Sequence, residues 1–463
     1  NVDGSEALFY VRATAEMALL KNPSDTSLSF QRITNSIQTL SPQKHDTFRN
    51  RLFVGRTDIP GIADVDNDGD LDILAFDIIE GYLEYYRNLE EELTGNPHDT
   101  FAFILEDRCW GCFEESGSGS NLPKINVNCN NYPRVNKKHI GSNILPLEMD
   151  NDGDMDLLYG DIGYRDLVLM INGRKEYTHP IDSITSVSGH FPQNTKAANM
   201  PEFLAAFKTQ VNDDGVYDLI VTPQSEITGK SLNQVWYYKN TGTPNNPQFT
   251  YMQQDFLQES MVDLGGNTAP TFLDYNGDGA VDLLVATEGD YALTKGIQDQ
   301  LVLYENQGTT ENPLYKAIQQ NYLGLRSNNL TGLRPAIGDL DGDQDMDLLL
   351  GNSNGRLIYY ENTASTGQPV SWQKQTAILD SIDVGRGSSP AIGDINNDGH
   401  NDLLIGSASQ GLHYYRYTGM KNGKPEYEEV KQAFRSINKK QYRNTAPRLA
   451  DLDGNDSLDL VLD

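Results

Sequence analysis

A short acidic segment recurs seven times along this chain, always in the same frame. Its common form is Asp-x-[Asp/Asn]-x-Asp-Gly-x-x-Asp followed by three apolar residues. The copies begin at Asp64, Glu148, Gln210, Asp274, Asp339, Asp394 and Asp451. Successive copies start roughly 55 to 84 residues apart, which is the length range of a β-propeller blade. This repeat constrains the fold strongly, because one unit of that size cannot bury its own apolar faces.

The residues between the acidic segments predict four β-strands in each repeat. A short strand leads into the segment, and an apolar run such as residues 348–350 follows it, as expected for a strand buried on both faces. An aromatic strand such as residues 357–362 comes next, and an amphipathic strand completes the repeat. Four short antiparallel strands per repeat indicate an all-β chain that folds over residues 1–463 as one β-propeller of four-stranded blades. A linear β-solenoid or a string of small modules is the alternative.

The acidic segment has the composition of a calcium-binding loop. It places oxygen-bearing side chains at positions 1, 3, 5 and 9, and so many neighbouring carboxylates repel each other unless a cation lies between them. Calcium accepts six to eight oxygen ligands in flexible geometry. The residue at position 7 varies freely, as expected where a backbone carbonyl is the ligand, and glycine at position 6 permits a sharp turn. The sequence therefore predicts several Ca²⁺ ions, up to about seven, as structural cofactors.

The predicted metal ligands occupy positions 1, 3, 5, 7 and 9 of the seven copies. They are Asp64, Asp66, Asp68, Asp70, Asp72, Glu148, Asp150, Asp152, Asp154, Asp156, Asn212, Asp214, Asp218, Asp274, Asn276, Asp278, Ala280, Asp282, Asp339, Asp341, Asp343, Asp345, Asp347, Asp394, Asn396, Asp398, His400, Asp402, Asp451, Asp453, Asn455 and Asp459. The first and fifth copies have aspartate at positions 1, 3, 5 and 9 and are expected to bind calcium best, although Gln344 replaces the glycine of the fifth. The third copy, which begins with Gln210, and the last, where Asp456 displaces the glycine, are expected to be weak or empty.

An EF-hand begins with a similar pattern of aspartates, so the two kinds of loop have to be distinguished. The twelfth position of an EF-hand loop is a bidentate glutamate, whereas the twelfth position here is apolar or aromatic in all seven copies. The sequence therefore excludes the EF-hand. One isolated segment of this kind would be an Asx-rich turn without metal, but seven copies in register favour cation binding.

The three cysteines of the chain lie close together in the sequence. Cys109, Cys112 and Cys129 permit one local disulfide and leave one thiol over, and their spacing does not decide which two are paired. They fall within residues 89–143, where the interval between acidic segments is about twenty residues longer than elsewhere. We expect an insertion here, which is either a site for docking another protein or a disulfide-tied surface loop without a partner.

The overall charge and the motif content exclude several classes of function. The 66 acidic and 36 basic residues give a formal charge of −30, which repels nucleic acid and anionic membrane surfaces and attracts cations. No run of about 18 apolar residues is present, so membrane insertion is not expected. The motifs of serine hydrolases, zinc proteases and phosphate-binding loops are absent, and the seven histidines are dispersed. We therefore expect no enzymatic activity and no catalytic residues.

The acidic segments and the strands around them resemble the FG-GAP/VCBS repeat family, which includes the propeller of the integrin α-subunit. The resemblance covers essentially the whole chain and implies seven blades, with calcium in the loops between the first and second strands. A damaged copy at residues 1–11 allows an eighth blade. The segments HDTF at His45 and His98, CWGCFEE at Cys109 and LEYYRNL at Leu83 are similar to secreted repeat proteins of gliding Bacteroidota. That similarity implies surface export, which in this group is often linked to type IX secretion.

These features together lead to one expected function and two alternatives. We expect an extracellular or cell-surface calcium-binding propeller that acts as a non-enzymatic binding or adhesion module, with a protein or a glycan as its ligand. The first alternative is a polysaccharide-active enzyme on a propeller scaffold, because active sites on propellers assemble from distant loops. The second is a docking or scaffold component of a secretion or surface complex, with the insertion as its contact site.

Overall fold

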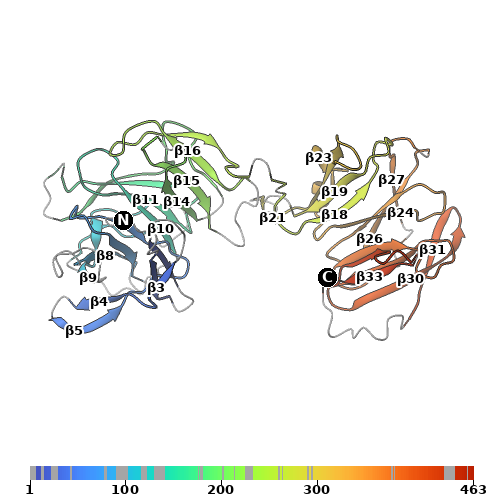
Figure 1. Cartoon of the computed structure of the whole chain (residues 1–463), viewed down its shortest axis with the longest axis horizontal. Coiled ribbons are helices and arrows are strands. Elements are labelled where there is room, and N and C mark those ends of the chain that lie inside the picture. The colour runs from blue at the N-terminus through green and yellow to red at the C-terminus, as the bar shows by residue number, and fades with distance from the viewer. Residues whose placement is uncertain are drawn as a thin grey trace. The chain divides into compact units, whose positions relative to one another are not determined.

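The computed structural model is all-β and is built from repeated antiparallel sheets (Figure 1). It describes residues 7–11, 15–21, 30–41, 44–77, 81–89, 103–115, 122–129, 141–175, 177, 181–200, 203–212, 214–224, 233–258, 261–262, 264–288, 291–292, 296–365, 367–376, 379, 381–431, 444–455 and 457–462. The chain divides into two compact units, Asn1–Met261 and Val262–Asp463. Within the described ranges, no helix is both long and apolar enough to cross a membrane.

The first unit contains four sheets. A three-stranded sheet has the order β1 (Ala7–Val11), β2 (Met17–Lys21), β3 (Gln31–Thr34). A six-stranded sheet has the order β5 (Lys44–Arg51), β4 (Gln38–Ser41), β9 (Phe103–Asp107), β8 (Leu83–Asn88), β7 (Asp72–Phe76), β6 (Gly61–Ala63). Two four-stranded sheets follow in chain order: β10 (Ser142–Leu147), β11 (Asp156–Asp161), β12 (Val168–Asn172), β13 (Ile184–Ser188), and then β14 (Leu204–Thr209), β15 (Asp218–Pro223), β16 (Trp236–Asn240), β17 (Phe249–Gln253).

The second unit repeats the same four-stranded pattern. Its sheets are β18 (Ala269–Leu273), β19 (Asp282–Thr287), β22 (Gln300–Asn306), β23 (Tyr315–Tyr322); β24 (Arg334–Gly338), β25 (Asp347–Gly351), β26 (Leu357–Asn362), β27 (Trp372–Gln375); and β28 (Ser388–Gly393), β29 (Asp402–Ser407), β30 (Gly411–Lys421), β31 (Lys424–Glu429). Two short pairs are β20 (Tyr291–Ala292) with β21 (Gly296–Ile297) and β32 (Pro447–Ala450) with β33 (Asp459–Leu462). The 3₁₀ turn η2 (Leu325–Asn328) follows β23.

The strand that follows the acidic segment is fully buried in several of the sheets. All five residues of β7 and β25 and all six of β29 are buried, as expected for an apolar run covered on both faces. Neighbouring sheets pack face to face, because Leu284 of β19 and Leu348 of β25 lie in one apolar cluster. The repeated sheets therefore form the propeller-like arrangement expected from the sequence. None of the described sheets closes on itself, and the blade number and the single closed domain stay predictions.

The cysteine-containing region is only partly an insertion. The fourth strand of the first repeat, β9, lies within residues 89–143, so the extra chain begins after it. The 3₁₀ turn η1 (Trp110–Cys112) follows, and Trp110 and the neighbouring Phe113 are buried in the core between β7 and β11. Cys109 forms a disulfide with Cys129, and Cys112 is the remaining thiol. The described part is thus anchored in the core, while residues 116–121 and 130–140 lie outside the described ranges.

Candidate metal centre

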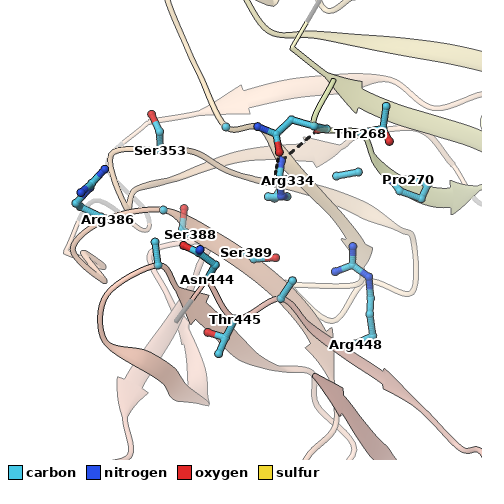
Figure 2. A pocket seen from close by; sticks show the side chains of 16 residues that line it. Thr268, Pro270, Arg334, Ser353, Arg386, Ser388, Ser389, Asn444, Thr445 and Arg448 are labelled. Carbon is cyan, nitrogen blue, oxygen red and sulfur yellow. Dashed lines mark hydrogen bonds between the residues drawn. The ribbon is translucent and has the colours of Figure 1, made fainter. Parts of the chain in front are cut away.

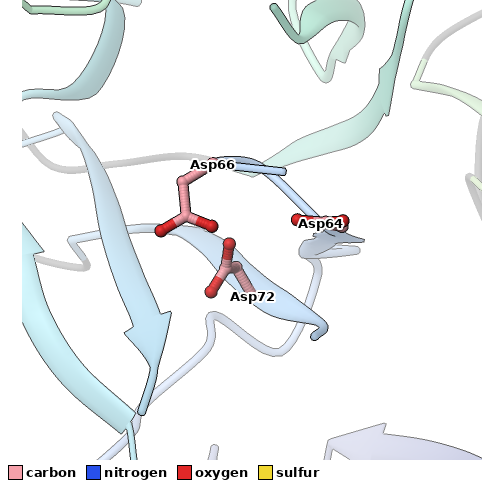
Figure 3. Close-up of side chains that lie close together, drawn as sticks. All are labelled: Asp64, Asp66 and Asp72. Atoms are coloured by element: carbon pink, nitrogen blue, oxygen red, sulfur yellow. The ribbon is translucent and has the colours of Figure 1, made fainter. Parts of the chain in front are cut away.

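Each acidic segment connects the first strand of a sheet to the second, as the sequence predicts. Position 9 is the first residue of the second strand in all seven copies: β7, β11, β15, β19, β25, β29 and β33. In four copies the carboxylates at positions 1, 3 and 9 converge, with one oxygen of each within 4.8 Å of the others. These clusters are Asp64, Asp66 and Asp72 (Figure 3); Glu148, Asp150 and Asp156; Asp339, Asp341 and Asp347; and Asp451, Asp453 and Asp459. Sets of oxygen donors at this spacing could hold a hard cation.

The third, fourth and sixth copies carry an amide instead of a carboxylate at position 3. The loop turns in the same way, because a backbone N–H two residues on donates to the oxygens of Asn276 at 3.0 Å and of Asp278 at 2.7 Å. Equivalent bonds connect Asn212 to the N–H of Asp214 and Asp398 to the N–H of His400. The last copy brings three carboxylates together although it lacks the glycine, and its expected weakness stays a prediction.

The aspartate at position 9 fastens the loop to the sheet. Asp347 is fully buried, and its two oxygens accept the backbone N–H groups of Leu340 in the loop and Asn362 in the third strand, both at 2.9 Å. The hydroxyl of Tyr359 donates a third bond at 3.1 Å. The same pair of backbone bonds recurs at Asp72, Asp156, Asp218 and Asp282. A carboxylate has about four acceptor sites, so three bonds leave room for a cation.

The carboxylate at position 1 shapes the loop from the other side. Asp339 accepts the backbone N–H groups of Gly342 at 2.7 Å and Gln344 at 3.0 Å. Asp274 accepts the corresponding groups of Gly277 and Gly279 at 2.8 and 2.9 Å. These bonds hold the loop closed around the side chains at positions 3 and 5. The backbone amides also offset part of the negative charge that gathers there.

The side chain at position 7 differs in kind and in contacts from one copy to the next. Ala280 has no side-chain donor atom, and the ring of His400 packs against Tyr417 with 4.9 Å between the ring centroids. Asp154 is buried, and its side chain accepts the backbone N–H of Lys175 at 3.0 Å. Coordination by the main-chain carbonyl of position 7 therefore stays a prediction.

Burial raises the pKa of several of these carboxyl groups. The pKa of Asp72 and that of Asp347 are raised to about 7, and the pKa of Asp156 to about 8, first by burial and then by nearby aspartates, against bonds from backbone N–H groups that lower them. Burial, followed by the negative charges of Asp343 and other aspartates, raises the pKa of Asp345 to about 6. Without a cation, the charged forms of these groups are therefore disfavoured.

These pKa values predict how pH affects the calcium-free protein. Because folding raises them above the unfolded value of 3.8, the folded state binds more protons than the unfolded chain between about pH 4 and 7. The free energy of unfolding without calcium should therefore fall as pH rises through this window. A cation displaces the protons, so calcium should raise the melting temperature more at about pH 8 than at about pH 5.5. Melting scans at the two pH values test this, and an equal or smaller effect at the higher pH would contradict it.

The loop needs two residues with positive φ, of which the sequence analysis identified one. Position 6 has φ of 102° at Gly69 and 88° at Gly399, as expected for glycine. Position 4 is also left-handed, with φ of 64° at Asn67 and 76° at Gly277. The sequence carries this signal, because position 4 is Asn or Gly in six of the seven copies and Asp in the third.

The exception at position 6 yields a stability prediction. Gln344 adopts φ of 73°, a conformation that costs a residue with a side chain roughly 1 to 2 kcal/mol. Since glycine loses more backbone entropy on folding, Gln344→Gly should raise the free energy of unfolding by a net of about 0.5 to 1 kcal/mol. Gly69→Gln, at the same position of the first loop, should have the opposite effect. Urea unfolding of both variants with calcium present tests the pair, and effects of the same sign would rule out this explanation.

Sequence reasoning did not assign a role to the asparagine that ends the third strand. Asn306 supplies the N–H that binds Asp282 at 2.7 Å, and its side-chain oxygen accepts the N–H groups of Gly308 and Leu314. The same three bonds occur at Asn240 and Asn362. This residue therefore connects the acidic loop to the turn before the fourth strand. The recurrence of asparagine at the end of the aromatic strand is the sequence feature from which this role could have been predicted.

Comparison with known proteins identifies the repeat. A model of the FG-GAP-like repeat matches the chain four times, over residues 210–285, 274–350, 339–405 and 394–462, which together span more than half of it. No curated protein sequence matches. Among solved structures, an Agrocybe aegerita lectin described as recognising non-reducing terminal N-acetylglucosamine is 13% identical. The alignment covers 92% of this chain and 89% of the lectin, with a TM-score of 0.27, too low to assign a fold or a ligand. On the family match, the chain belongs to the FG-GAP-like repeat family.

Proposed function

We propose that the chain is a calcium-binding module that recognises a ligand outside the cell or at its surface and catalyses no reaction. The observation that carries the calcium part is the convergence of three carboxylates, one of them anchored in the sheet, in four separate loops. The donor set consists of oxygen atoms, as calcium prefers, and no histidine or cysteine belongs to any cluster among the described residues. Side chains at positions 1, 3, 5 and 9 and the carbonyl at position 7 would hold the ion.

Calcium would act structurally in this proposal. The ion would neutralise the carboxylates and join positions 1 and 3 of the loop to position 9, which begins the second strand and is already bonded to the third. Neighbouring loops also contact each other, because the side-chain amide of Asn67 donates to the carbonyl of Gly153 at 3.0 Å. In the second unit, Asn401 donates in the same way to Asp339 at 2.9 Å. Ordering one loop would therefore help to order the next.

A location outside the cell is supported by the disulfide of the chain and agrees with the calcium affinity expected of its loops. Repeat loops of this charge are expected to bind calcium in a range that extends to about 10⁻³ M, a concentration typical of extracellular sites. The disulfide between Cys109 and Cys129 fits an oxidising compartment. Surface export of the kind found in gliding Bacteroidota is part of this proposal. Fractionation of cells that produce the native protein tests it, and recovery in the cytoplasm alone would contradict it.

The ligand is proposed to be a protein or a glycan, and binding is expected to depend on calcium. The labelled protein should be applied to a glycan array and to immobilised extracellular proteins, first in millimolar calcium and then after chelation. We expect reproducible binding with calcium and its loss after chelation, because the loops that shape the surface become disordered without the ion. No binding under either condition would overturn the binding role. Release of products from a panel of polysaccharides would overturn its non-enzymatic part.

A further inference from the structure

A cavity of about 1000 Å³ opens in the second unit, where the first strands of four sheets begin (Figure 2). These strands, β18, β24, β28 and β32, lie side by side in this order. Their first residues line the cavity together with the short segments that precede them. The acidic loops follow these strands in the sequence, so the cavity lies at the strand ends away from the metal centres.

The cavity is basic although the chain is strongly acidic. Its lining includes Arg334, Arg386 and Arg448, and no carboxylate is among the lining residues that the structure describes. Serine, threonine and asparagine side chains supply further hydrogen-bond donors. The chain has a formal charge of −30, so its composition would lead one to expect acidic residues around a cavity. A cavity lined by three arginines and by no described acidic residue is therefore unexpected.

The repeat does not require arginine at these positions. Arg334 directly precedes Pro335, and the residues before the corresponding prolines of the other sheets are Ala269, Ser389 and Ala446. Arg448 directly follows Pro447, and the residues after the other prolines are Thr271, Ala336 and Ala391. Arg386 lies at a third position, four residues before Pro390. Three arginines from three different repeat positions therefore line one cavity, which packing of the scaffold alone does not explain.

One buried polar group of the cavity lacks a hydrogen-bond partner among the described residues, and the arginines keep unused donors. The side chain of Ser389 is only 6% exposed, and its hydroxyl oxygen has no hydrogen-bond partner within the described part of the chain. Arg386 is exposed, and its guanidinium makes no hydrogen bond or ion pair with the described residues. Arg334 donates to the carbonyl of Leu333 at 2.9 Å and to the side-chain oxygen of Asn267 at 3.3 Å. Arg448 donates to the carbonyl of Pro447 at 3.1 Å. Burial, followed by the positive charge of Arg334, lowers the pKa of Arg448. Positive charges gathered in one cavity repel each other, and a bound anion offsets this repulsion.

The nearby carboxylates of the chain do not act as the anion that would join these arginines. Asp299 is buried and attracted by Arg334, but no ion pair joins the two among the described residues, and Asp299 does not line the cavity. Glu288 is bonded to the side chain of Asn267. The arginines therefore retain N–H groups for a further acceptor, because each guanidinium carries five.

We propose that this cavity binds a small ligand that carries two or more oxyanion groups, either carboxylate or sulfate. A planar guanidinium pairs with such a group through two parallel hydrogen bonds. Arg334 lies on β24 and Arg448 on β32, the strands on either side of β28, and Arg386 lines another part of the cavity, so different arginines would bind different oxyanion groups of the ligand (Figure 2). No aromatic side chain is among the lining residues described, so charge and hydrogen bonding decide recognition, without ring stacking. This ligand adds to the binding function proposed above and needs no calcium in the cavity.

Isothermal titration of the full chain in calcium-containing buffer tests the proposal. The probes are inorganic sulfate, digalacturonate with its two carboxylates, and uncharged maltose as the control. We expect digalacturonate to bind more tightly than sulfate, maltose not to bind, and added sodium chloride to weaken binding. Arg334→Ala and Arg448→Ala should each weaken digalacturonate binding about tenfold or more. Ser389→Ala should weaken it a few-fold, since its hydroxyl is a single neutral donor.

The controls separate loss of the site from loss of the fold. Alanine occupies the equivalent positions at Ala446 and Ala391 in neighbouring sheets, so both arginine variants should fold, and circular dichroism checks this. Arg416→Ala removes an exposed arginine paired with Glu428 outside the cavity and should leave binding unchanged. Absence of binding by both anions, equal affinity for sulfate and digalacturonate, or unchanged binding in the Arg334 and Arg448 variants would each overturn the proposal. The calcium-dependent rise in melting temperature should persist in these variants. A failure of the anion-binding proposal can therefore be distinguished from a failure of the calcium proposal.

Discussion

Removal of calcium is expected to lower the melting temperature of each unit by about 10 to 20 °C. Among the described residues, each unit holds two carboxylate clusters, those of Asp64 and Glu148 in the first and those of Asp339 and Asp451 in the second. A site at a hundred times its dissociation constant adds about 2.7 kcal/mol, so two sites add about 5 kcal/mol. For units of this length, 1 kcal/mol shifts the melting temperature by about 2 to 4 °C.

Calorimetry with excess calcium and with a chelator measures this effect. Magnesium at the same concentration is the control, and it should restore less of the lost stability, because it demands a tighter octahedral site and gives up its water reluctantly. The shift should grow with the logarithm of free calcium concentration. Superimposable melting curves with and without chelator would remove the structural role of calcium.

The substitution Asp347→Ala is expected to destabilise the second unit strongly even without calcium. It removes the acceptor of three buried donors, namely the N–H groups of Leu340 and Asn362 and the hydroxyl of Tyr359. Leaving buried donors unsatisfied costs about 1 to 3 kcal/mol each, and relaxation around the small alanine lowers the sum, so we expect a loss of about 3 to 5 kcal/mol. Chemical denaturation in the presence of chelator measures it.

The same substitution at Asp341, in the same loop, provides the matched control. Asp341 makes one long bond, 3.3 Å from the N–H of Asp343, and burial together with the charge of Asp343 raises its pKa. Asp341→Ala should therefore leave the calcium-free stability nearly unchanged while it reduces the stabilisation by calcium. Equal losses for the two variants without calcium would show that position 9 has no separate structural role. Should Asp347→Ala fail to fold, Tyr359→Phe removes one donor and should cost less.

Features confined to one repeat could be predicted from the sequence. The frame of the acidic segment placed positions 1, 3, 5 and 9 in one loop between two strands, because local spacing determines which side chains share a turn. The apolar run after it indicated a strand buried on both faces, and β25 is such a strand. The bonds of Asp347 to Asn362 and Tyr359 were not predicted, since they join strands across the sheet and depend on register.

Features that depend on packing between sheets could not be predicted. Trp110 lies in a stretch that reads as a surface loop, yet it is buried where two sheets meet. Arg334, Arg386 and Arg448 are separated by more than fifty residues in the sequence and occupy different positions of the repeat. Their proximity arises only when neighbouring first strands pack side by side. A linear pattern contains no sign of such a cavity.

The most direct test of the cation loops is elemental analysis of the protein after dialysis against millimolar calcium. If the clusters that end in Asp72, Asp156, Asp347 and Asp459 each hold one ion, we expect four or more calcium ions per chain. Any calcium ions beyond these four would be bound by the loops with an amide at position 3. Fewer than one calcium ion per chain would contradict the account.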